Sequence, residues 1–154
     1  QIRVSPFDRA RQTAAIVSAA IGLEPVIDDD LREMDCGAFD GKTDAESWGA
    51  FMSIYRRWLA ADASARYPDG ESWQEGAERF RRGLAKAEPN TTTLFVTHGG
   101  ISSAVIPYLC VNAAVLRGSS GVGNTGIVEL EVYDTIDGQA RYACLAWNRL
   151  DHLE

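Results

Sequence analysis

The sequence predicts an α/β fold: three layers, α/β/α, with a mostly parallel sheet and an antiparallel hairpin at its edge. Residues 1–4 and 93–98 each form a short strand-like apolar run, and each run is followed by a turn and a helical pattern. Repeated strand–turn–helix units are typical of a parallel sheet. Two further apolar strands, at 127–133 and 141–147, are joined by a tight turn and predict the hairpin.

Composition narrows the class of protein. The 154 residues suggest one domain, and a hydrophobic content of 45% is enough for an ordinary globular core. A formal net charge of −7 argues against a nucleic-acid partner. No apolar run is long enough to span a membrane. The three cysteines are scattered and show no spacing for a disulfide framework or a zinc site, so a cytoplasmic location is the default.

The first strand–turn–helix unit places an arginine near a strand end. Ser5 is a suitable N-cap, Pro6 suits the first helical position, and Gly22 fits the position after the helix. Arg9 then lies in the first turns of the helix, where it can point toward the end of the strand. A solvated surface arginine is the ordinary alternative. The predicted buried stripe of this helix consists of Ala10, Ala14, Val17 and Ile21.

The second unit ends its strand on a histidine. His98 is followed by Gly99, Gly100 and a helical pattern over 100–110. Open α/β sheets bind ligands at the carboxyl ends of their strands, and the amino end of a helix favours anions. The position therefore suits a binding histidine, although a histidine with a purely structural hydrogen bond fits the same pattern.

The chain between the two units is predicted to hold a loop and two helices. Residues 31–41 contain two glycines and several carboxylates, so Glu33 is either a solvated loop acid or part of a functional loop. Residues 44–61 form a helix with an aromatic stripe. Ser72 and Glu75 have the spacing of a capping box that begins the next helix.

Several of these segments together resemble one family. Residues 5–14 read S-P-F-D-R-A-R-Q-T-A and resemble the S-P-x-x-R-A-x-Q-T-A signature of the histidine phosphatase superfamily, the phosphoglycerate mutase-like phosphatases. Residues 31–41 are similar to its L-x-E…G…G loop, 68–72 to its P-x-G-E-S segment and 96–100 to its second-histidine motif. Residues 124–126 and 147–153 resemble its closing segments, so the likeness covers nearly the whole chain.

The resemblance implies a phosphomonoester hydrolase that acts through a phosphohistidine on a phosphorylated small molecule. It assigns Arg9 as a phosphate clamp and His98 as a pocket histidine that donates to the phosphoryl group. Gly99, with Gly100, leaves room for a close backbone approach. Glu33 would be the proton donor and later the base that activates water. No metal and no cofactor is implied, because cationic side chains meet the phosphoryl oxygens.

One departure from the family is large. The superfamily's nucleophile is the histidine of an Arg-His-Gly motif at the end of the central strand, whereas the histidines here are His98 and His152, and neither lies in such a string. Either the chain is a fragment that lacks an amino-terminal strand, loop and helix, or it is a natural remnant. We favour a fragment, because a sheet without its central strand exposes unpaired edges. The chain alone is then predicted to be inactive.

The branch of the superfamily is the remaining question. The 31–41 loop and the compact spacing from Glu33 to His98 favour the small phosphatases over the phosphoglycerate mutases. A non-catalytic member that binds phosphorylated ligands stays as a further alternative. The sequence leaves the natural substrate and the oligomeric state open, and a homodimer is among the states it allows.

Overall fold

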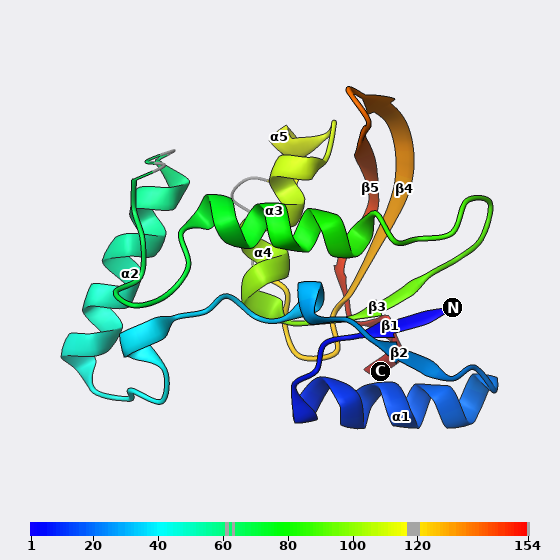
Figure 1. The fold of residues 1–154 in the computed structure, drawn as a ribbon, viewed down its shortest axis with the longest axis horizontal. Helices are drawn as coiled ribbons and strands as arrows, with labels where there is room; N and C mark the ends of the chain where they lie inside the picture. The colour runs from blue at the N-terminus through cyan, green and yellow to red at the C-terminus, as the bar shows by residue number, and fades with distance from the viewer. Residues whose placement is uncertain (61, 63, 117–120, 154) are drawn as a thin grey trace.

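The computed structural model describes residues 1–60, 62, 64–116 and 121–153. Its centre is a three-stranded parallel sheet in the order β2-β1-β3 (Figure 1). The strands are β1 (Ile2–Val4), β2 (Pro25–Ile27) and β3 (Leu94–Val96). Val4 is in register with both Ile27 and Val96, so the three strands end at the same edge of the sheet.

Helices cover both faces of this sheet, as Figure 1 shows. Helix α1 (Asp8–Ile21) lies on one side and packs Ala10 and Ala14 against β1. Helices α3 (Trp73–Leu84) and α4 (Gly99–Leu109) lie on the other side, over the larger buried cluster. The predicted α/β class, its layers and its mostly parallel sheet are confirmed.

The start of α1 differs from the prediction. The helix begins at Asp8, and its N-cap residue is Phe7, which makes no side-chain capping bond. Ser5 is fully buried instead, and its Oγ accepts from the Phe7 N–H over 3.3 Å and lies 2.7 Å from Nε2 of His98. The predicted end is confirmed, since Gly22 adopts a φ of 71° and its N–H donates to the Ser18 carbonyl over 2.8 Å.

The hairpin is confirmed, but it is not an edge of the parallel sheet. Strands β4 (Ile127–Ile136) and β5 (Gln139–Arg149) pair only with each other in the named sheets of the described residues. Their turn places Asp137 and Gly138 at positive φ values of 51° and 75°. The free side of β5 contacts the chain after α4: the Val111 N–H donates to the Tyr142 carbonyl over 2.8 Å, so these backbone groups are not available to a sheet strand.

The remaining segments extend from this framework. Helix α2 (Ala45–Leu59) stands to one side in Figure 1, and Phe51 on α2 stacks on Tyr67 with ring centroids 4.8 Å apart. The predicted capping box of Ser72 and Glu75 is present at the start of α3. No helix in the described part of the chain is long and apolar enough to cross a membrane. The short helical turns are η1 (Asp29–Leu31), η2 (Gly37–Phe39), α5 (Ala113–Leu116) and η3 (Asp151–Leu153).

Candidate active site

The predicted site residues Arg9 and His98 meet at the carboxyl edge of the sheet. Strands β1 and β3 are neighbours, and the Ser5 N–H donates to the Val96 carbonyl over 2.9 Å just beyond them. The helices that follow the two strands therefore begin side by side. Nε of Arg9 donates to Nδ1 of His98 over 3.2 Å, although the two residues are 89 positions apart in the sequence.

His98 is held by a partner on each ring nitrogen. Since Nδ1 accepts from Arg9, we assign the proton to Nε2, which donates to Ser5 Oγ over 2.7 Å. The ring of Phe7 lies 5.2 Å away, and only 7% of His98 is exposed. Burial first, and then the charges of Arg9 and Arg79, lower the pKa of His98 to about 4. The ring is therefore uncharged at neutral pH.

Arg9 still has donors for a ligand. Only its Nε is bonded within the described residues, and its terminal nitrogens form no hydrogen bond or ion pair there. The side chain is exposed, and Cζ lies 5.0 Å from the centre of the Phe7 ring. A guanidinium anchored at Nε and open at both terminal nitrogens can bind two oxygens of one oxyanion.

Glu33 occupies the amino end of α4, next to His98. Its Oε2 accepts from the Gly100 N–H over 3.0 Å, and Oε1 accepts from the Ile101 N–H over 2.5 Å. A third bond, of 3.0 Å, comes from the Met34 N–H. A Cβ atom on Gly100 would stand 2.8 Å from both carboxylate oxygens, so a side chain at this position would displace the Glu33 carboxylate. The close approach at Gly99 is made by the Val122 carbonyl, 2.5 Å from where a Cβ would be.

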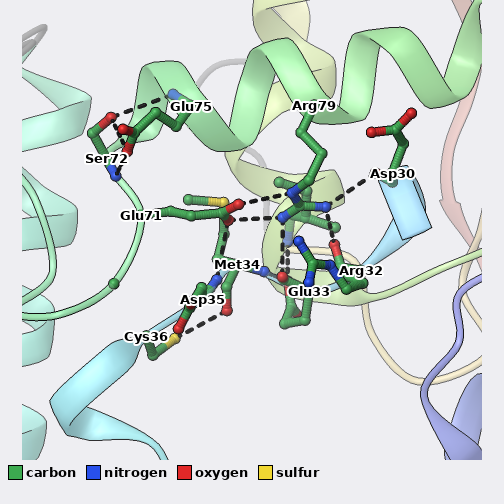
Figure 2. Close-up of polar contacts among 12 residues, drawn as sticks. Asp30, Arg32, Glu33, Met34, Asp35, Cys36, Glu71, Ser72, Glu75 and Arg79 are labelled. Carbon is green, nitrogen blue, oxygen red and sulfur yellow. Dashed lines mark hydrogen bonds and ion pairs between the residues drawn. The ribbon is translucent and has the colours of Figure 1, made fainter.

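Arg79 of α3 is a buried arginine that binds both the backbone of Glu33 and the side chain of Glu71. Figure 2 shows it among the backbone carbonyls of the Glu33 loop and the carboxylate of Glu71. Nε and Nη2 bind the two oxygens of Glu71 at 2.8 and 2.7 Å. Burial acts to raise the pKa of Glu71, but the hydrogen bonds and charge of Arg79 outweigh it and hold that pKa below its usual range.

Similarity to a known protein family places this chain. The family model of the histidine phosphatase superfamily (branch 1) matches residues 1–145. The chain belongs to this superfamily.

Relatives and solved structures agree with this membership. A bifunctional protein of Mycobacterium tuberculosis is 37% identical over 121 residues, which are 77% of this chain and 31% of that protein. A Hydrogenobacter thermophilus protein, placed by its name with the phosphoserine phosphatases, is 30% identical over 83% of this chain and 64% of its own length. The native structure of mycobacterial glucosyl-3-phosphoglycerate phosphatase has a TM-score of 0.74 and 26% identity, covering 96% of this chain and 76% of that one. The chain thus spans less than two thirds of either curated relative.

The structure brings Arg9, His98, Gly99 and Glu33 to one corner, and their roles in a site stay predictions. Two further residues of this corner, Ser5 and Arg79, were not among the predicted site residues. Ser5 was noticed only as a helix cap, and no local signal pointed to His98 as its partner. The signal for Arg79 was a charged residue between Ala77 and Phe80 of the buried helix face. Among the described residues no group of three His, Cys, Asp or Glu side chains could hold a metal ion.

Proposed function

We propose that the protein, as its full-length chain, hydrolyses phosphomonoesters of small molecules through a phosphohistidine intermediate. The single observation that carries the proposal is the Arg9–His98 pair, with a contact of 3.2 Å, at the amino end of α4. In this proposal Arg9, His98 and Gly99 bind the phosphoryl group. The phosphatase names of one curated relative and of the mycobacterial structural neighbour support hydrolysis.

The chemistry of phosphoryl transfer fits these residues. Its barrier falls mainly through positioning and through fixed positive charge around the phosphoryl oxygens. Arg9 offers two terminal nitrogens, and the amino end of α4 adds the partial positive charge of a helix dipole. His98 can donate from Nδ1 to the phosphoryl group either as the doubly protonated ring or as the neutral tautomer in which Ser5 Oγ donates to Nε2.

Glu33 is the proposed proton donor to the leaving alkoxide. Its carboxyl group lies beside Gly100, two residues along the chain from His98. Both oxygens accept backbone hydrogen bonds, so donation requires the group to release at least one of them. After the leaving group departs, the same carboxylate is placed to activate water, which completes hydrolysis.

The nucleophile is proposed to come from a segment of the full-length protein upstream of Gln1. Of the chain's two histidines, His98 has both ring nitrogens engaged, and His152 lies in the carboxyl-terminal turn η3. In the described residues β3 pairs only with β1, and the hairpin pairs with neither, so the outer edge of β3 can accept a further strand. Such a strand would end at the same edge as Ser5 and His98. The 154-residue chain alone is then expected to show no turnover.

The test uses the full-length protein with p-nitrophenyl phosphate and an alkyl phosphate, and it measures the burst of alcohol release before steady state. Arg9→Ala is expected to abolish the burst with both substrates. Glu33→Gln should slow it about 10²–10⁴-fold with the alkyl phosphate. The same substitution should slow the burst much less with p-nitrophenyl phosphate, because nitrophenolate leaves without a proton. Glu78→Gln, an exposed carboxyl that binds Gln74, is the matched control.

Three outcomes would contradict the proposal. No turnover by the full-length protein, with phosphate bound at the Arg9–His98 corner, would favour a non-catalytic phospholigand-binding member. Transfer to a second phosphorylated alcohol in preference to water would favour a mutase. A normal Glu33→Gln burst together with a failed Glu71→Gln burst would move the acid role to Glu71.

A further inference from the structure

We propose that Arg79 is a positioning residue for the reaction, which fixes the Glu33 carboxyl group against the amino end of α4 without touching the substrate. The inference rests on the role proposed above for Glu33. It assigns to one buried side chain on α3 the geometry of residues 30–35, named here the acid loop.

Arg79 uses all five of its N–H donors. A guanidinium carries five N–H groups. Two bind Glu71, and the other three bind carbonyl oxygens of the acid loop: Asp30 at 3.0 Å, Arg32 at 2.9 Å and Glu33 at 3.1 Å. Only 5% of Arg79 is exposed. A lysine has three donors and no planar fork, so it cannot reproduce this set.

Glu33 is bound at both its backbone and its carboxylate. Its own carbonyl accepts from Nη2 of Arg79, while its carboxylate accepts from the Gly100 and Ile101 N–H groups. The backbone of Glu33 is therefore fixed to α3 and its side chain to α4. A displacement of the backbone by 1 Å would remove the carboxyl group from its place beside His98.

Glu71 binds the other end of the acid loop, at Asp35. Its Oε2 accepts from the Asp35 N–H over 3.1 Å, and its own N–H donates to the Asp35 carbonyl over 2.9 Å (Figure 2). Arg79 neutralises the Glu71 carboxylate that makes the first of these bonds. Removing the charge of Arg79 would leave a largely buried carboxylate without its ion-pair partner, which is costly. The informative variant therefore keeps a positive charge at residue 79 but lacks the planar guanidinium group.

That variant is Arg79→Lys in the full-length protein, with Arg82→Lys as the matched control. Arg82 lies on the same helix and pairs with the side chain of Asp30, outside the five bonds. We expect Arg79→Lys to lower kcat on the alkyl phosphate about 100-fold, the cost typical of a 1 Å misplacement, and to leave KM within twofold. KM should hold because Arg79 makes no contact with Arg9 or Gly99. Arg82→Lys should leave both constants unchanged.

A double-mutant cycle separates positioning from general structural support. If Arg79 acts through Glu33, then the variant with both Arg79→Lys and Glu33→Gln should be no slower than Glu33→Gln alone, within threefold. The inference would be overturned if the kcat losses of the two single variants multiplied in the double variant. It would also be overturned if KM rose in Arg79→Lys as kcat fell. If Arg79→Lys does not fold, then Glu71→Gln takes its place in the same cycle, with an expected loss about tenfold smaller.

Hydrogen exchange keeps this inference distinguishable from the proposed function. In Arg79→Lys the amide protons of Gly100 and Ile101 should exchange faster than in the wild type, because their acceptor is displaced, while the amides of α1 should be unchanged. If the wild-type full-length protein is inactive and Arg79→Lys still exchanges faster at Gly100 and Ile101, the positioning of Glu33 by Arg79 is retained and the proposed function is rejected. Unchanged exchange and unchanged kcat in an active enzyme would reject the positioning role alone.

Discussion

Gly100→Ala tests whether the acid loop and α4 depend on each other as the structure indicates. The added Cβ would lie 2.8 Å from both oxygens of Glu33, and the carboxyl group of Glu33 supplies the three atoms nearest to it. The carboxylate is the end of a flexible side chain, so it would move away rather than distort the backbone. It would then lose its bonds to the Gly100 and Ile101 N–H groups.

The expected magnitude follows from two opposing effects. Loss of a side-chain acceptor at a helix amino terminus costs about 0.5–2 kcal/mol. Replacing a helical glycine by alanine returns about 0.5–1 kcal/mol. We therefore expect Gly100→Ala to lower the free energy of unfolding by about 0.5 kcal/mol, the difference between the midpoints of the two ranges. Gly49 in α2 has open space where its Cβ would be, so Gly49→Ala should raise the free energy by about 0.5–1 kcal/mol.

Urea denaturation of the two full-length variants measures this difference, and burst kinetics on an alkyl phosphate measures its catalytic consequence. Gly100→Ala should be less stable than the wild type and slower in the burst, whereas Gly49→Ala should be more stable and equally fast. A Gly100→Ala protein that matches Gly49→Ala in both measurements would refute the contact between Glu33 and α4.

Two further predictions concern stability. Burial, with the charges of Arg9 and Arg79, lowers the pKa of His98 from 6.5 to about 4, so the unfolded chain binds a proton in this interval that the folded chain does not. The free energy of unfolding should therefore fall as the pH falls from 6.5 to 4, by up to about 1.4 kcal/mol per pH unit from this group. His98→Gln should remove that component in urea titrations, and an equal slope in both proteins would contradict it. Trp58→Phe should cost about 1–3 kcal/mol, because the buried Nε1–H donates to the Ala65 carbonyl over 2.8 Å. Trp48→Phe, at a side chain 62% exposed, should stay within about 0.5 kcal/mol, and equal losses by thermal unfolding would count against this packing.

Local patterns were sufficient for most of the fold. The capping box of Ser72 and Glu75, the glycine after α1 and the turn at Gly138 involve residues a few positions apart, so their chemistry is visible in the sequence. The strand-end logic also placed Arg9 and His98 at one edge, because parallel neighbours end together. Their roles, and that of Gly99, stay predictions.

Contacts between residues far apart in the sequence account for the features that the sequence did not predict. Ser5 has the local properties of a helix cap, yet a histidine 93 residues later binds its hydroxyl group. Arg79 binds three backbone carbonyls, and because every residue type has a backbone carbonyl, the sequence does not indicate these bonds. The hairpin was expected at an edge of the parallel sheet, but β4 and β5 form a sheet of their own among the described residues, and alternation of apolar residues cannot distinguish these two arrangements.

The most direct test of the central claim is a crystal structure of the full-length protein with bound phosphate. The account predicts the anion at the amino end of α4, with the terminal nitrogens of Arg9 on two of its oxygens, Nδ1 of His98 on a third and the backbone of Gly99 alongside. An anion bound elsewhere, with the 3.2 Å contact between Arg9 Nε and His98 Nδ1 unchanged and no density at this corner, would contradict it.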